Sequence, residues 1–150
     1  RMWYLSYTHW VNVEGNYEPC YNIKYAESKD GIKWNLTGTT CIDYSFENEA
    51  IAAPNVWIEN NQYYMMYSYR NSLRYRQDPE CGYKLGLAAS EDGIRWERID
   101  SHLCMQGPRK SWEKDMNAYP NVINYGKKSV LLYNGSGFGK TGFGYATRNL

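Results

Sequence analysis

The sequence has almost no excess charge of either sign and no long apolar run. Its 150 residues include 17 Lys and Arg against 16 Asp and Glu, a net charge of +1. Binding to a nucleic-acid backbone or an anionic membrane surface needs a clustered basic excess, so we expect neither partner. No apolar segment approaches the roughly 20 residues of a membrane-spanning helix, and Arg1 begins no signal peptide. These absences leave the compartment open and favour the cytoplasm.

Typical helix formers and closely spaced cysteines are scarce as well. Ala, Leu and Glu are sparse, whereas 16 Tyr and 6 Trp raise the aromatic content to 17%. So much ring surface excludes a disordered chain and favours strands over helices. The cysteines lie too far apart for a zinc knuckle, and the sequence predicts no metal and no cofactor. Their placement permits two disulfides, Cys20–Cys41 and Cys81–Cys104, but four buried thiols fit at least as well.

An internal repeat organises the chain. Residues 21–34 align without gaps on residues 83–96, and both contain Ser-x-Asp-Gly-Ile-x-Trp. A Pro-Asn-Val segment at 54–56 recurs at 120–122. A third landmark is a strand-like run at residues 2–7, 63–69 and 129–135. The three landmarks keep one order and nearly one spacing, so the chain is built from similar units.

Each unit reads as four short strands. The first follows Pro-Asn-Val, the second is rich in Tyr and Met, and the fourth begins at Trp34 or Trp96 after an Asp-Gly turn. Four antiparallel strands per repeat are typical of a β-propeller blade, and we expect both Trp side chains in the core. The first unit lacks its first strand and the last unit lacks its fourth. The sequence therefore predicts an all-β partial propeller of about two and a half blades (1–46, 47–112 and 113–150).

A ring of this kind needs further blades. Closed propellers have about 4–8 blades, and open sheet edges favour aggregation. We therefore expect the remaining blades to come from the rest of a longer chain or from oligomerisation.

Acidic residues follow the same repeat. Glu49 and Asp115 each lie five residues before the Pro of their unit, and Glu47 and Glu113 each lie seven before it. The first strand of a blade lines the central channel, so these carboxylates are predicted to meet at one channel mouth. Two carboxylates around a pocket suit glycoside cleavage, in which one stays ionised and the other protonates the leaving oxygen. The alternative is that they are solvated charges on loops.

Two other motifs lead to no activity. The segment 137–142 matches Gly-x-Gly-x-x-Gly, but a phosphate site needs a helix behind it and the following residues read as a strand. We therefore expect a glycine hairpin. His9 and His102 have no Ser or Cys at a suggestive spacing, so no catalytic triad is predicted.

The motifs resemble a known family. The repeated Ser-x-Asp-Gly-Ile-x-Trp turn, the Glu49–Trp57 segment and Met66–Arg70 look like the five-bladed β-propeller glycosidases. This furanosidase-like group includes glycoside hydrolase families 32 and 43, and the resemblance is greatest to uncharacterised bacterial members. It covers the whole chain but about half of a family-sized propeller. The resemblance implies three acidic residues from successive blades, of which Glu49 and Asp115 (or Glu113) match two.

The third acidic position would lie before Arg1, and Ala53 stands where such relatives often carry Arg. These two positions depart from the family pattern. As a whole, the resemblance implies a carbohydrate-active, glycoside hydrolase-like propeller that acts on a glycosidic bond. The alternative is a non-catalytic carbohydrate-binding or assembly module with an incomplete acid set. Arg70 either contacts a substrate hydroxyl or carboxylate or pairs with a structural acid. The other candidate substrate-binding residues are Trp57, Trp112, Tyr119 and Asn134, with Trp10 as a further ring at the mouth.

Overall fold

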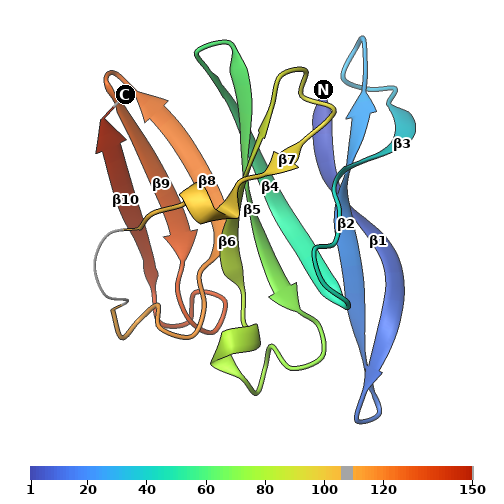
Figure 1. Ribbon diagram of the computed structural model, residues 1–150, viewed down its shortest axis with the longest axis vertical. Coiled ribbons are helices and arrows are strands. Elements are labelled where there is room, and N and C mark those ends of the chain that lie inside the picture. Colours follow the sequence, from blue (N-terminus) through green and yellow to red (C-terminus); the bar gives the residue numbers. More distant parts are fainter. Residues whose placement is uncertain (106–109, 150) are drawn as a thin grey trace.

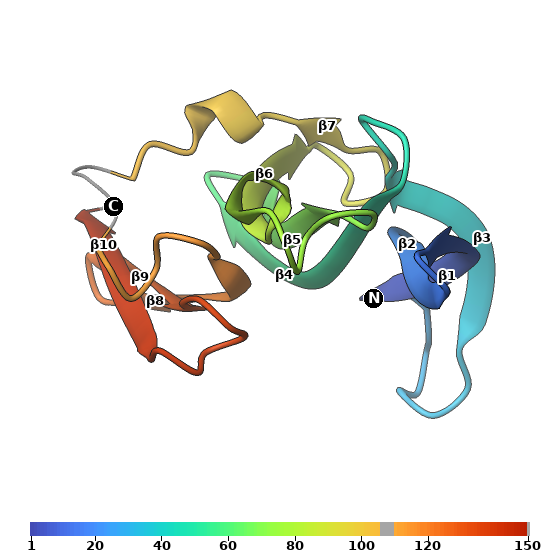
Figure 2. The same ribbon diagram turned by 90° about the horizontal axis from the view of Figure 1, so that it is seen from below.

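The computed structural model describes residues 1–105 and 110–149, which form three antiparallel sheets. The first sheet contains β1 (Met2–Val13), β2 (Asn16–Glu27) and β3 (Asn35–Ile42). The second contains β4 (Glu49–Glu59), β5 (Gln62–Asn71), β6 (Lys84–Ser90) and β7 (Glu97–Arg98). The third contains β8 (Ala118–Tyr125), β9 (Lys128–Asn134) and β10 (Phe143–Asn149). The sheets stand side by side in chain order, with the second in the middle (Figures 1 and 2).

The observed strands confirm the predicted all-β fold. The sheets hold three, four and three strands, and each sheet follows the chain order without a crossover. The only helices in the described ranges are two short 3₁₀ turns, η1 (Pro79–Cys81) and η2 (Asp100–His102). Neither is long and apolar enough to cross a membrane. The first strands of the sheets are neighbours, because β4 contacts both β1 and β8.

The Ser-x-Asp-Gly turn has the same hydrogen bonds in both repeats. The Asp30 carboxylate accepts the backbone N–H groups of the residues two and three further along, both at 2.8 Å, and Ser28 Oγ accepts that of Gly31 at 2.8 Å. The carboxylate of Asp92 accepts the corresponding groups at 2.7 and 2.8 Å. Gly31 has a φ of +73°, a conformation that side-chain-bearing residues adopt at a cost. The turn chemistry therefore explains why this motif recurs.

The Trp residues that end these turns differ in burial. Trp96 packs edge-on against Trp3 of the first sheet, at 6.2 Å between ring centroids, and lies against the core. Both indole N–H groups donate to the Gly93 carbonyl, at 3.1 and 2.8 Å. Trp34 is 37% exposed, so the prediction that it lies in the core is wrong. The physical reason is that Trp96 packs on the preceding sheet, and no described sheet precedes the first.

The core lies between the sheets rather than within any one of them. Along β5, Met65 and Tyr67 face the first sheet while Met66 faces the third, as the two-residue period of a strand requires. Gly86 makes room for the Tyr67 ring, because a Cβ there would lie 2.3 Å from it. The core between the first and second sheets includes Ile23, Tyr25, Cys41, Ile42, Ile51 and Ala88. The core between the second and third sheets includes Leu85, Leu131 and Tyr133.

All four cysteines are free thiols. Cys20 and Cys41 are buried in the first sheet, whereas Cys81 is half-buried and Cys104 is exposed. Burial raises the pKa of Cys41 to about 12, so its thiol behaves as a small apolar group. The structure therefore contains free thiols and neither of the two disulfides that the spacing permits, but the reading as four buried thiols is wrong for Cys81 and Cys104, which are not buried.

Candidate functional site

The innermost strands of the second and third sheets carry matched bulges. The register shifts between Ala52 and Asn55 in β4, and at the corresponding place in β8. Ala53 and Tyr119, each directly before a proline, have φ values of +54° and +56°. A left-handed conformation costs a residue other than glycine about 1–2 kcal/mol, and residues before proline prefer extended conformations. Strain at equivalent positions of neighbouring blades points to a function for this end of the strands.

All three sheets contribute side chains to a cluster at the same end of the molecule. We call it the arginine–tyrosine cluster. This end carries the end of β5 and η1, and it is the lower end of the molecule in Figure 1. The cluster consists of Tyr21 from the first sheet, Arg70, Tyr75 and Tyr83 from the second sheet and its connections, and Tyr119 from the third.

Arg70 is the centre of this cluster and is only 3% exposed. Its Nε donates to the Tyr83 hydroxyl at 3.1 Å, and its guanidinium lies 3.7 Å from the centre of the Tyr75 ring. The Tyr83 hydroxyl is also 2.5 Å from that of Tyr21, its equivalent in the repeat. Arg70 Nη1 has no hydrogen-bond partner within the described part of the chain. Arg70 therefore holds the tyrosines in place instead of facing open solvent.

A structural acid balances the charge of Arg70. Glu18 Oε2 lies 3.8 Å from Arg70 Nη2, and the Glu18 carboxylate also accepts hydrogen bonds from Tyr75 and Arg76, both at 2.9 Å. Burial opposes ionisation of Glu18, but the hydrogen bonds from Arg76 and Tyr75 lower its pKa. Burial likewise opposes the charge on Arg70, which the oxygens of the neighbouring tyrosines support, so its pKa is raised. The alternative in which Arg70 pairs with a structural acid is the one that the structure contains.

Two half-exposed aromatic rings lie on this cluster. Tyr119 is 40% exposed and Phe138 is 42% exposed. Their ring centroids lie 5.9 and 6.0 Å from that of Tyr83. Phe138 also has a left-handed backbone, with a φ of +60°. Phe138 was not among the residues predicted from the sequence, although an aromatic residue between Gly137 and Gly139 at a hairpin tip is an unusual signal.

The loop that carries Phe138 is closed by its own backbone hydrogen bonds. The N–H groups of Gly139, Lys140 and Gly142 donate to carbonyls of the same loop at 3.0–3.2 Å. These amides are therefore not available to a phosphate, and the next element is the strand β10. The Gly-x-Gly-x-x-Gly match is a hairpin loop, as the sequence predicts.

Asp115 lies beside this loop. Its backbone N–H donates to Ser136 Oγ at 3.1 Å, and its carbonyl lies close to Gly82. The side chain is half-buried, and no described residue forms a hydrogen bond or an ion pair with the carboxylate. Among the predicted acidic residues, Asp115 and the exposed Glu47 are therefore the two whose carboxylates have no partner in the described part of the chain, and Asp115 is the half-buried one.

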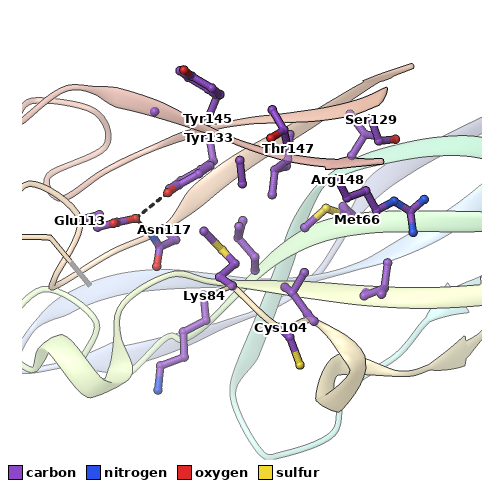
Figure 3. A pocket seen from close by; sticks show the side chains of 18 of the residues that line it. Met66, Lys84, Cys104, Glu113, Asn117, Ser129, Tyr133, Tyr145, Thr147 and Arg148 are labelled. Atoms are coloured by element: carbon purple, nitrogen blue, oxygen red, sulfur yellow. Dashed lines mark hydrogen bonds between the residues drawn. The ribbon is translucent and has the colours of Figure 1, made fainter. Parts of the chain in front are cut away.

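Glu113 lies on the other side of this segment, in a cavity of about 1350 Å³ between the second and third sheets. Its carboxylate accepts hydrogen bonds from the Tyr133 hydroxyl at 2.7 Å, Asn117 Nδ2 at 3.1 Å and the Lys110 backbone at 3.2 Å. Figure 3 shows Glu113, Asn117 and Tyr133 converging at one end of the cavity. Burial, followed by the hydrogen bond to Glu113, raises the pKa of Tyr133. Both Glu113 oxygens are therefore occupied by neutral donors.

Trp57 and Trp112 line the same cavity, and both rings also pack against neighbouring residues. Trp57 stacks on Tyr64, at 5.6 Å between centroids. The Trp112 ring lies against Gly144, where a Cβ would come within 2.4 Å of it. Asn134 pairs with Ala118 across β8 and β9, and its side chain lies against Gly139. Trp10 is 56% exposed on the first sheet.

Glu49 is fully buried and bound on both oxygens. Arg98 Nη1 lies 3.0 Å from each carboxylate oxygen, and the Ser45 backbone N–H donates at 2.6 Å. Arg98 also pairs with Asp100 at 3.0 Å, and Asp100 accepts a hydrogen bond from Tyr67 at 2.6 Å. Burial opposes the charge of Arg98, and the surrounding phenol and carboxylates raise its pKa.

Glu49 and Asp115 have different neighbours in the structure. Arg98, the partner of Glu49, also reaches the Asp43 carbonyl that follows the first sheet. Asp115 instead contacts Gly82 and Ser136, between the second and third sheets. Within the described residues no three His, Cys, Asp or Glu side chains gather as a metal site would require.

Sequence comparisons find relatives that are longer than this chain. An uncharacterized protein of Mycobacterium tuberculosis strain H37Rv is 34% identical over 147 residues, covering 97% of this chain and 46% of that protein. A beta-1,2-mannobiose phosphorylase of Thermoanaerobacter sp. is 29% identical over 102 residues, covering 63% of this chain and 33% of that protein. The chain thus spans about half or less of the relatives it matches. No family model matches it.

Solved structures with similar folds are glycoside hydrolases. A family 117 enzyme of Zobellia galactanivorans has a TM-score of 0.67 at 21% identity, covering 85% of this chain and 37% of the enzyme. The Bombyx mori family 32 beta-fructofuranosidase gives 0.64 at 20% identity, covering 99% and 31%. A thermostable family 43 enzyme gives 0.57 at 18% identity, covering 99% and 49%. The chain therefore has the fold of the propeller glycoside hydrolases, which confirms the resemblance seen in the sequence at the level of fold.

Proposed function

We propose that this chain is part of a carbohydrate-active, glycoside hydrolase-like propeller that acts on a glycosidic bond at the end carrying the arginine–tyrosine cluster. The observation that carries the proposal is the half-buried Asp115, whose carboxylate has no partner among the described residues and whose backbone is hydrogen-bonded to the loop that carries the exposed Phe138 ring. A sugar site needs a free carboxylate and flat rings. The carboxylate takes part in cleaving the glycosidic bond, and the rings stack on the C–H faces of the sugar.

In this proposal Asp115 is the carboxylate of the third unit that meets the substrate. Glu113 and Glu49 remain candidates by register only, because neutral donors occupy Glu113 and Arg98 neutralises Glu49. Both are proposed to position the segments that precede β8 and β4. Glycoside cleavage uses a pair of carboxylates, so the second acid is proposed to come from a blade outside this chain.

The second candidate function is a non-catalytic carbohydrate-binding or assembly module. The observation that favours it is the buried Glu49–Arg98 pair, which removes one of the register-matched carboxylates from any ligand. In this case Tyr119, Phe138 and Asp115 would bind sugar without turnover.

Glycosidase assays separate the two functions. The full chain is incubated with a panel of aryl furanosides and pyranosides and with β-1,2-mannobiose, with and without inorganic phosphate because one relative is named a phosphorylase. We expect turnover that Asp115→Asn lowers by at least about 100-fold, the scale of acid–base catalysis, with Glu47→Gln as a matched exposed control. Turnover unchanged in Asp115→Asn would overturn the catalytic assignment, and sugar binding without turnover would favour the binding module.

Further blades are also proposed, from a longer polypeptide or from other chains. The first and third sheets expose large apolar side chains, among them Leu36 at 63%, Tyr125 at 82% and Phe143 at 77%. We also propose that each sheet is one blade, with the boundaries 1–46, 47–112 and 113–150.

A further inference from the structure

We propose that Phe138 and Tyr119 form one aromatic platform that binds a sugar ring by its C–H face. This inference rests on the proposed function and deepens it. It adds Phe138 as a specificity-determining residue and names the kind of ligand surface that the site recognises. The juxtaposition is specific, because the two residues come from different elements, the β9–β10 loop and the bulge of β8.

The platform has a rigid base. Both rings contact Tyr83, which is 4% exposed, and Phe138 also contacts Tyr75 at 6.5 Å between centroids. The Tyr83 hydroxyl is fixed by Arg70 and Tyr21. A ligand on the two exposed rings would therefore meet a surface that does not need to rearrange, which lowers the entropic cost of binding.

The backbone at both rings is held in a strained conformation by specific bonds. The Tyr119 N–H donates to Ser68 Oγ at 2.8 Å, and Ser68 is fully buried in β5. On the Phe138 side, Thr141 Oγ1 donates to the Trp112 carbonyl at 2.6 Å and the Ser136 N–H donates to the same carbonyl at 2.9 Å. Left-handed residues other than glycine persist only when their surroundings enforce them, and they cluster at binding sites.

The chemistry of the surface favours a sugar over a purely apolar ligand. The rings are apolar on their faces, while the Tyr119 hydroxyl supplies a polar group and Asp115 lies on the segment bonded to the Phe138 loop. Asp115 is joined to the loop two residues before Phe138, through Ser136. A sugar ring has the same division, with C–H bonds on its face and hydroxyls at its edge. The platform therefore suits a sugar with an uninterrupted C–H face.

The test measures binding of methyl glycosides to the full chain by chemical-shift titration. The probes are methyl β-glucopyranoside, methyl β-mannopyranoside and methyl α-arabinofuranoside. Phe138→Gly and Tyr119→Gly remove the rings and fit the left-handed backbone, so the fold is retained. We expect each to weaken binding by about three- to tenfold, the scale of one lost ring contact. Tyr119→Phe keeps the ring and should bind within about twofold of the wild type.

Controls make the outcomes distinct. Tyr145→Ala removes a 71% exposed ring on β10, a strand that contributes no residue to the platform, and should leave binding unchanged. If the wild-type chain binds none of the probes, the proposed function fails and the inference falls with it. If the wild type binds and Phe138→Gly binds equally well, the platform is wrong while the proposed function stands.

Discussion

At the scale of single residues, the pair of Glu49 and Arg98 determines how the second sheet holds together. Glu49 has no exposed surface and Arg98 is 18% exposed. Breaking a buried ion pair costs about 3–5 kcal/mol, and we expect the low end of that range here because Arg98 keeps Asp100 as a second acidic partner. We predict that Glu49→Gln lowers the free energy of unfolding by about that amount, measured by urea denaturation.

The control for this prediction is an exposed pair in the connection between β5 and β6. Arg74 and Asp78 lie 3.4 Å apart with Arg74 70% exposed, so Arg74→Met should cost less than about 1 kcal/mol. The double variant Glu49→Gln with Arg98→Met should recover part of the loss. An unfolding free energy of Glu49→Gln equal to that of the wild type would contradict the buried pair.

The sequence identified the register of the acidic residues but not their surroundings. The five-residue distance to proline placed Glu49 and Asp115 at matching points. The partner of Glu49, however, lies 49 residues further along the chain, and no local pattern announces it. Phe138 escaped prediction for a similar reason, because its contact with Tyr83 depends on how two sheets pack. The spacing of a carboxylate from a proline can be read from the sequence, whereas its ionic partner depends on the tertiary structure.

At the scale of elements, the two Asp turns make stability depend on acid pH. The backbone N–H groups of Lys33 and Ile32 lower the pKa of Asp30, and those of Arg95 and Ile94 do the same for Asp92. A folded pKa below the ordinary value of about 4 means that the unfolded chain binds protons first as the pH falls. The contribution is therefore complete above about pH 4 and is lost as the pH falls through the folded pKa values.

We predict that Asp30→Asn with Asp92→Asn flattens this acid loss. The melting temperature of the wild type should fall more steeply between about pH 4 and 2 than that of the double variant. Glu91→Gln, which changes an exposed carboxylate beside the second turn, is the matched control. Parallel melting curves for the wild type and the double variant across this range would refute the prediction.

These turns and the strands around them could be predicted from the sequence, because their chemistry is local. The Ser and Asp side chains satisfy backbone groups within the same few residues. The bulges at Ala53 and Tyr119 could not, because a left-handed residue before proline contradicts local preference. There the packing of neighbouring sheets, through the bond from Tyr119 to Ser68, overrides the preference of the chain.

At the scale of the whole molecule, the outer sheet faces predict self-association of the isolated chain. Phe143 and Tyr145 on β10 are 77% and 71% exposed, and β10 is also an edge strand. Exposed apolar patches on an unpaired edge favour association. We predict that light scattering finds species larger than one chain, and that Phe143→Lys with Tyr145→Lys shifts the distribution toward the monomer.

Added charge alone must be separated from the loss of apolar surface. Thr39→Lys with Gln77→Lys adds the same charge at exposed polar positions and should change the distribution less. A monodisperse monomer of the unmodified chain, with strongly protected amides in all three sheets, would contradict the need for further blades.

The carbonyl of Gly93 has a consequence for how such a molecule can grow. It accepts one indole from its own turn and one from the neighbouring sheet. In the first repeat the carbonyl of Gly31 accepts an indole from its own turn, Trp34. The second unit carries Met65 at the place of Trp3 and so offers no indole to a turn of the next sheet. Copies of the second unit in series would therefore lack this crosslink, whereas a unit with both a tryptophan in its second strand and an Asp-Gly turn would form it on both sides.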